Sequence, residues 1–181
     1  MRQVVKGGGK IKKKKPTIKK RRIHKKYGTS KLEVYFAKEF LDKMGLVYIY
    51  QYEAKDIKRF FDFVLTAYDD VPYITETKDG IKCVKQEGQY FHACLCIEVY
   101  GDYYHANPKK VDVNNLNPMQ KHNKFVDKLK DEWCGRHCIP LLRIWEDDIR
   151  NNPEKVRKEI EKYMGVGHKK RLIMENKKKP H

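Results

Sequence analysis

Hydrophobic residues recur at helical spacing in some segments of the chain and at strand spacing in others. Apolar residues at helical spacing from Leu32 to Met44 predict a first helix. Ser30 and Glu33 have the spacing of a capping box at its start. Asn-Pro pairs typically begin helices, and they predict two more helices, at 118–136 and 153–164. Runs rich in β-branched and aromatic residues predict strands at 46–52, 60–67, 91–100 and 139–145.

Residues 68–90 are expected to form an insertion, because Asp79-Gly80 is a typical turn of a β-hairpin. The element order is then helix, two strands, hairpin, strand, helix, strand and helix. This order predicts an α/β fold in which helices cover a mixed sheet. We expect one domain over residues 29–167, with a low-complexity basic tail at 1–28 that is disordered when free and a basic C-terminal tail at 168–181.

The predicted central strand contains a carboxylate, Glu98. Because side chains alternate along a strand, Glu98 is expected on the face opposite Leu95, Ile97 and Val99. A buried carboxylate is costly unless it is paired or binds a cation. Glu98 is therefore either a paired core acid or a metal ligand.

Asp62 is a second carboxylate in an apolar strand, and alternation places it opposite Phe61 and Phe63. Carboxylates on two adjacent strands can share one Mg²⁺, with phosphate oxygens and water as further ligands. Bound Mg²⁺ can polarise a phosphodiester and activate a water molecule. The alternative is that Asp62 pairs with Arg59 or Lys58 at the strand end.

Three further polar residues are candidates, each with an alternative. Glu33 also fits a capping role, and Asp127 also fits a solvated helix position paired with Lys130. His105 follows the central strand, where it fits a general acid or base or a phosphate ligand, although a lone loop histidine often does neither. Nucleic-acid bases can stack on exposed aromatic rings. Tyr100, Tyr103 and Tyr104 could serve in this way, and packing in the core is the alternative role for these rings.

The formal net charge of +17 is concentrated at the two ends of the chain. Residues 1–26 carry 13 Lys and Arg and no acid, whereas residues 27–167 carry 22 basic and 23 acidic side chains. Basic tails typically bind nucleic acid by counterion release; solubility, ribosome association and contact with anionic lipids are the alternatives. The expected nucleic-acid contacts are Lys12, Lys13, Lys14, Lys15, Lys19, Lys20, Arg21 and Arg22.

No segment has the apolar length of about 20 residues that spans a bilayer, and the N-terminus has no signal-peptide pattern. We therefore expect a cytoplasmic protein, in a bacterial or phage-infected cell, with no membrane contact, no small-molecule cofactor and reduced cysteines. The pairs Cys94/Cys96 and Cys134/Cys138 could suggest a zinc site. Strand alternation favours small apolar fillers for the first pair.

The ordered set of these elements resembles the PD-(D/E)XK nuclease superfamily over residues 29–164. The segments that carry the likeness are the helix with Glu33, the strand with Asp62, the segment Ile97–His105, the helix with Asp127, and the strand 139–145. The similarity is to the very-short-patch-repair-like branch, which includes phage-encoded and EDxHD-type homing endonucleases. It implies a restriction-endonuclease-like αβββαβ core with an inserted β-hairpin and flexible basic tails. It also implies Mg²⁺-dependent hydrolysis of DNA phosphodiesters by nicking or double-strand cleavage, with Mn²⁺ as a substitute.

By this resemblance, Asp62 and Glu98 are metal ligands, and Glu33 binds the metal directly or through water. His105 and Asp127 match further active-site positions, and the long helix lines the site with Gln120, Asn123 and Lys130.

The sequence departs from the superfamily pattern, which has Glu-x-Lys where this chain has Glu98-Val99-Tyr100. Lys130 is expected to replace the missing lysine, or Tyr100 and His105 take part of its role. Asp102 stands where the repair enzymes have a zinc-binding cysteine.

The sequence thus predicts a metal-dependent DNA endonuclease that is a monomer or a homodimer. One alternative is a non-catalytic nucleic-acid-binding protein on a degenerate nuclease fold. Another is an assembly factor that holds genomic DNA through its tails. Convergence of three acids in a solvent-accessible cleft would favour the enzyme.

Overall fold

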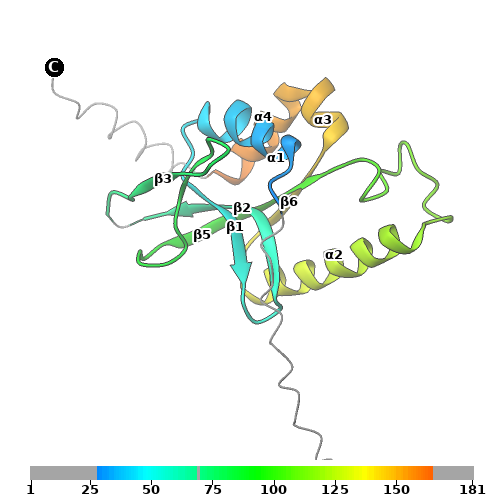
Figure 1. Cartoon of the computed structure of the whole chain (residues 1–181), viewed down its shortest axis with the longest axis horizontal. Coiled ribbons are helices and arrows are strands. Elements are labelled where there is room, and N and C mark those ends of the chain that lie inside the picture. The colour runs from blue at the N-terminus through cyan, green and yellow to red at the C-terminus, as the bar shows by residue number, and fades with distance from the viewer. Residues whose placement is uncertain (1–27, 69, 165–181) are drawn as a thin grey trace, which may run out of the picture.

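A computed structural model describes residues 28–68 and 70–164 of the chain (Figure 1). The expected element order is confirmed, with a short extra helix between β6 and α4. The elements are α1 (Lys31–Phe36), the π-helix η1 (Ala37–Asp42), β1 (Tyr48–Ala54), β2 (Arg59–Ala67), β3 (Ile74–Glu76), β4 (Lys82–Val84), β5 (His92–Tyr100), α2 (Pro118–Arg136), β6 (Leu141–Trp145), α3 (Glu146–Asn151) and α4 (Pro153–Tyr163).

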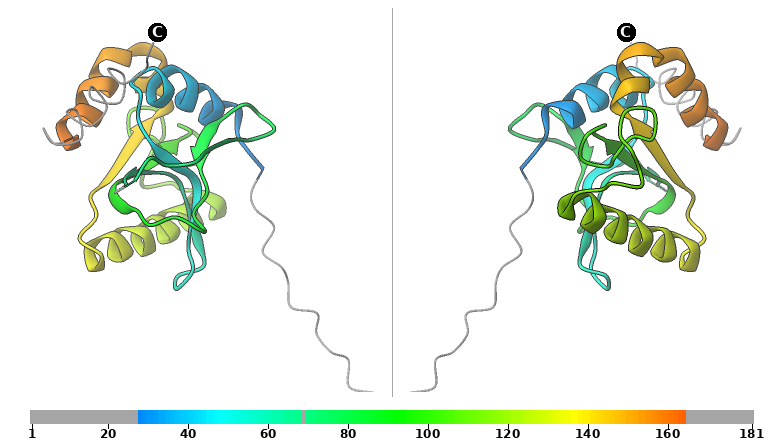
Figure 2. Two further views of the ribbon diagram at one scale, coloured as in Figure 1. Left: turned by 90° about the vertical axis from the view of Figure 1, so that its left-hand side faces the viewer. Right: turned by 90° about the vertical axis from the view of Figure 1, so that its right-hand side faces the viewer.

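A four-stranded mixed sheet in the order β1-β2-β5-β6 forms the centre of the fold. β1, β2 and β5 are antiparallel neighbours, and β5 pairs in parallel with β6. Helices α1, α3 and α4 cover one face of this sheet and α2 covers the other (Figure 2). The fold is therefore mixed α/β, as the element order predicts. None of the described helices has the length and apolar character needed to cross a membrane.

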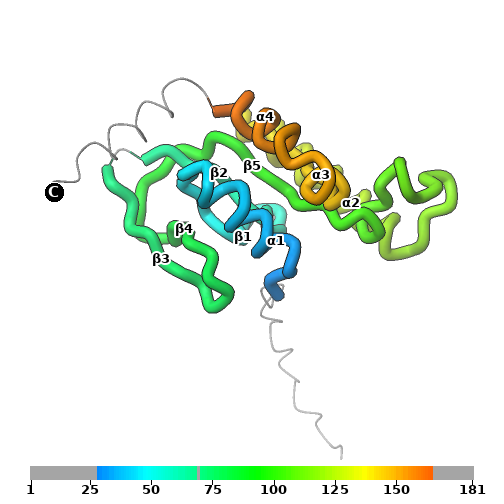
Figure 3. The backbone as a smooth tube through the Cα atoms, turned by 90° about the horizontal axis from the view of Figure 1, so that it is seen from above, coloured from blue at the N-terminus to red at the C-terminus, as the bar shows by residue number. Residues whose placement is uncertain are grey.

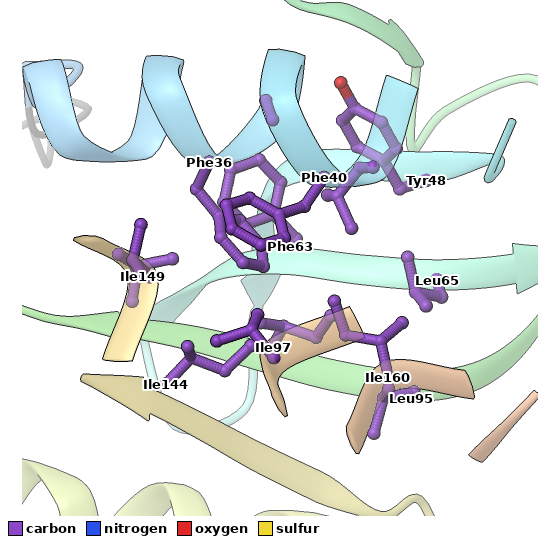
Figure 4. Packing of buried hydrophobic residues seen from close by; sticks show 14 of the residues in the cluster. Phe36, Phe40, Tyr48, Phe63, Leu65, Leu95, Ile97, Ile144, Ile149 and Ile160 are labelled. Carbon is purple, nitrogen blue, oxygen red and sulfur yellow. The ribbon is translucent and has the colours of Figure 1, made fainter. Parts of the chain in front are cut away.

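The larger apolar core lies between the sheet and the helices α1, η1, α3 and α4 (Figure 4). Phe36 stacks on Phe40 with ring centroids 5.2 Å apart, and it meets Phe63 of β2 at 5.6 Å. Leu95 and Ile97 of β5 belong to the same cluster, on the face that strand alternation predicts. This core holds the first helix against the centre of the sheet.

A second, smaller core joins the sheet to α2, and it corrects the predicted position of Phe61. Phe61 packs against Trp133 with ring centroids 5.1 Å apart, on the face opposite Phe63. The reason is a local irregularity in β2, since Asp62 has no pairing partner on either neighbouring strand. Gln51, which the register places opposite Asp62, has a left-handed φ of 50°. Strict alternation therefore fails at Asp62.

The predicted hairpin between residues 68 and 90 is present as the two-stranded sheet β3–β4, which lies beside β1 and α1 (Figure 3). Gln86, just beyond β4, attaches the hairpin region to the edge of the main sheet. Its side-chain carbonyl accepts from the Glu53 N–H at 2.9 Å, and its amide donates to the Glu53 carbonyl at 3.0 Å. One side chain thus reproduces both hydrogen bonds of a strand neighbour.

Replacing Phe36 with alanine is expected to lower the free energy of unfolding by about 3–5 kcal/mol, because the ring is fully buried between helix and sheet. Tyr35→Ala is the matched control on the same helix, since Tyr35 is 47% exposed; its effect is expected to stay within about 0.5 kcal/mol. Urea unfolding followed by circular dichroism measures both. Equal losses would contradict the packing of α1 on the sheet.

Candidate functional site

Asp62, Glu98 and Lys130 converge where β2, β5 and α2 meet. The Lys130 Nζ lies 2.5 Å from Glu98 Oε2, and both residues are buried. The backbone N–H of Asp62 donates to the other Glu98 oxygen at 3.3 Å, while Asp62 Oδ2 accepts from the Val99 N–H at 2.8 Å. The irregular pairing of β2 thus places the two carboxylates side by side.

These contacts decide between the alternative pairings that the sequence allows for Asp62 and Asp127. Asp62 bonds to the backbone of β5, and among the described ion pairs it has none with Arg59 or Lys58. Lys130 pairs with Glu98 and Asp127 with His105, so the alternative of a solvated pair between Asp127 and Lys130 is not what the structure shows. Lys130 therefore lies against Glu98 on the face of β5 that α2 covers.

The carboxylates carry more negative charge than Lys130 balances. Burial, followed by the nearby charge of Glu98, raises the pKa of Asp62 well above its usual value, although Lys130 opposes the shift. Burial lowers the pKa of Lys130, but the charges of Glu98 and Asp62 outweigh burial and raise it overall. The lysine is therefore a stable cation between two acids, and full ionisation leaves one negative charge in excess.

This donor set suits a hard cation in part. Asp62 is partly exposed, and its Oδ1 accepts no hydrogen bond from the described residues. Mg²⁺ commonly binds one or two carboxylates and completes its shell with water and phosphate oxygens. Within residues 28–68 and 70–164, no group of three or more His, Cys, Asp or Glu side chains is arranged to hold a metal ion. A hard cation could thus bind two carboxylates here, those of Asp62 and Glu98, and Glu98 already binds Lys130.

Glu33 lies near this pair but is engaged elsewhere. Ser30 Oγ caps α1 by accepting from the Glu33 N–H at 3.0 Å, as the capping-box spacing predicts. The Glu33 carboxylate instead accepts from the Tyr50 hydroxyl at 2.7 Å. Its charge contributes to the raised pKa of Asp62, which places it within electrostatic reach of that residue. Tyr50, which sequence analysis did not select, therefore fixes this acid.

His105 and Asp127 form a second polar group around the ring of Tyr100. The His105 ring stacks on Tyr100 with centroids 3.7 Å apart, and its Nδ1 lies 3.5 Å from Asp127 Oδ2. Arg143 of β6 donates to the Tyr100 hydroxyl at 2.5 Å and to the Asp127 carbonyl at 3.1 Å. Burial raises the pKa of Asp127, but hydrogen bonds from His105 and Tyr100 outweigh it and lower the pKa. Asp127 is therefore an anion that orients His105.

Two predicted lining residues hold the loop that follows β5. Gln120 donates to the Tyr103 carbonyl at 2.7 Å, and Asn123 donates to the Tyr104 carbonyl at 2.9 Å. The rings of Tyr103 and Tyr104 stay 61% and 58% exposed. Gln120 and Asn123 therefore position the loop and its aromatic rings.

Ion pairs anchor the same loop at Asp102, where the resemblance has a cysteine. Asp102 accepts from Asn107 and from Lys110, each at 2.7 Å, and Lys110 also reaches Asp147 at 2.8 Å. Burial raises the pKa of Asp102, but the bonds from Lys110 and Asn107 outweigh it and lower the pKa. Cys96 packs in the smaller core, as expected for a small apolar side chain, whereas Cys94 is only partly buried. Cys134 of α2 packs in the same core.

The role of Arg143 is not predicted from the sequence. Its only signal there is that it is a charged residue within an apolar strand. The eight predicted nucleic-acid contacts between Lys12 and Arg22 lie outside the described residues. No model of a known protein family matches the chain, and comparisons with curated proteins and with solved structures gave no match.

Asp62→Asn is expected to make the folded protein more stable than wild type at pH 7. Folding raises the pKa of Asp62, so the wild-type protein loses stability as pH rises from the unfolded-state pKa of about 3.9 toward the folded-state pKa. Asparagine does not ionise, so the variant does not lose this stability. The difference should shrink as pH falls to about 4. Urea unfolding between about pH 4 and pH 8, in EDTA, measures it.

Asp127→Asn is the control with the opposite sign, because folding lowers the pKa of Asp127. Its ionised form contributes stability that is present above the unfolded pKa and lost as pH falls. This variant should therefore be less stable than wild type at pH 7. If Asp62→Asn were also less stable there, the proposed charge excess would be refuted.

Proposed function

We propose that the chain is a metal-dependent endodeoxyribonuclease with a restriction-endonuclease-like αβββαβ core. The observation that carries this proposal is the buried contact of Lys130 with Glu98 beside Asp62. Two carboxylates and one lysine on adjacent elements supply the groups that hydrolysis of a phosphodiester at a metal ion requires.

The arrangement of the core supports the proposal. Without the hairpin, the elements follow the order α1, β1, β2, β5, α2 and β6, and the last strand pairs in parallel with β5. Asp62 and Glu98 lie on the two central strands. Lys130 reaches the same place from α2, which offsets the missing lysine of the Glu-x-Lys pattern.

Asp62 and Glu98 would hold Mg²⁺ together with oxygens of the DNA phosphate, and Glu33 would bind through water. When bound, Mg²⁺ supplies a polarised phosphate and an activated water. Lys130 would then stabilise the negative charge that develops on the phosphate. His105, held by Tyr100 and Asp127, would exchange a proton with an oxygen at the reacting phosphorus.

DNA would be bound by surfaces outside this centre. The basic segments at the two ends of the chain supply affinity that does not depend on sequence. The exposed rings of Tyr103 and Tyr104, beside His105, offer surfaces on which bases can stack.

A non-catalytic nucleic-acid-binding protein is the second candidate function. It is favoured by the existing bond between Lys130 and Glu98, which occupies one potential metal-binding oxygen. It is also favoured because no group of three or more potential ligand side chains is arranged for a metal within the described residues. Cleavage assays separate the two functions.

Asp62→Asn and Glu98→Gln are each expected to lower Mg²⁺-dependent cleavage of plasmid DNA by about 100-fold or more, because each removes an anionic ligand. The control is Glu132→Gln, which removes one charge from an exposed position of α2. It should cleave at the wild-type rate, and EDTA should stop cleavage by wild type. Wild-type rates for both site variants would rule out this centre.

Lys130→Met is expected to destabilise the protein by about 3–5 kcal/mol in EDTA, because Glu98 is then buried without its partner. Mg²⁺ should raise the melting temperature of this variant more than that of wild type, since the cation can take the place of the ammonium group. Lys128→Met, at an exposed position of α2, is the control. Equal Mg²⁺ effects on both variants and wild type would argue against cation binding at Glu98.

A further inference from the structure

A groove of about 290 Å³ lies between α2 and the edge strand β6, beside the carboxylate centre. Tyr100 and Asp127 contribute to its wall, so the groove adjoins the group that holds His105. Asp62, Glu98 and Lys130 do not line it. A molecule in this groove would therefore lie next to the proposed centre without entering it.

Two lysines give the groove a positive edge. Lys124 and Lys128 are exposed and lie one turn apart on α2. Among the described residues, no carboxylate lies within 4.0 Å of either ammonium group. By contrast, Arg143 in the same groove is paired with Asp131 at 2.7 Å. The two ammonium groups are thus available for an anion from solvent.

An aromatic ring held in place forms part of the opposite wall. Trp145, at the end of β6, is partly exposed and meets the buried ring of Tyr100 edge to face at 5.2 Å. Arg143 fixes Tyr100 through its hydroxyl. A fixed ring beside cations is the combination that binds a stacked base and its phosphate, and Asp131 offers an acceptor for a base edge.

We propose that this groove is a subsite for one nucleotide of a DNA strand. Its base would lie against Trp145, and its phosphate would lie between Lys124 and Lys128. This proposal rests on the proposed nuclease function, since it assigns the groove to a nucleotide that flanks the cleaved phosphodiester. The volume is near the lower limit of the ~300–1,000 Å³ that is typical of small-molecule sites, which suits a single nucleotide.

The test uses the full chain in EDTA and a 5′-phosphorylated thymidine trinucleotide as the probe, with tryptophan emission as the readout. Binding should change the emission of wild type, and Trp145→Phe should abolish the change, because Trp133 is buried away from the groove. The double variant Lys124→Ala/Lys128→Ala should bind about 10-fold more weakly. Lys158→Ala/Lys162→Ala removes two exposed lysines at the same spacing on α4 and should bind like wild type.

An abasic trinucleotide with the same phosphates should bind at least about 10-fold more weakly, because it cannot stack. Equal binding of the abasic probe, or equal weakening in the two lysine variants, would overturn the subsite. Wild type that binds the probe as described but leaves plasmid DNA intact with Mg²⁺ would refute the nuclease and keep the nucleotide site. Cleavage without any emission change would refute the subsite alone.

Discussion

The ion pair between Lys130 and Glu98 connects α2 to the central strand, and the candidate site depends on it. Two charges buried together are tolerated only with close contact and further hydrogen bonds, which the Asp62 N–H supplies to Glu98. Asp62 then adds a second carboxylate that Lys130 cannot neutralise. Folding thus disfavours the ionised form of Asp62 and raises its pKa, and perturbed carboxylates of this kind cluster at functional sites.

Much of this arrangement could be predicted from local sequence. Alternation along β5 is regular, so the opposite faces of Ile97 and Glu98 follow from spacing alone. Phe61 could not be placed in this way, because the irregularity at Asp62 accompanies a hydrogen bond that the Asp62 N–H donates to Glu98, 36 residues further along the chain. The partners Tyr50–Glu33 and Arg143–Tyr100 are likewise contacts between distant segments, 17 and 43 residues apart, which periodicity cannot report.

The loop after β5 illustrates a second limit of sequence reasoning. In the sequence, Asp102 differs from a cysteine pattern and carries no other signal, yet it accepts hydrogen bonds from two side chains and helps join the loop to α3 through Lys110. Gln120 and Asn123 hold the next two residues of the loop, Tyr103 and Tyr104, against α2. The loop that carries His105, the candidate general acid or base, is therefore held by ion pairs and by hydrogen bonds from side-chain amides.

Gln86 has a consequence for how copies of this protein meet. An outer strand normally presents unpaired amide and carbonyl groups, and these recruit strands from other molecules. At Glu53 both groups are already satisfied by one glutamine side chain. A strand from another molecule would have to displace that side chain before it could pair with Glu53, so this point of the sheet edge is protected against β-aggregation.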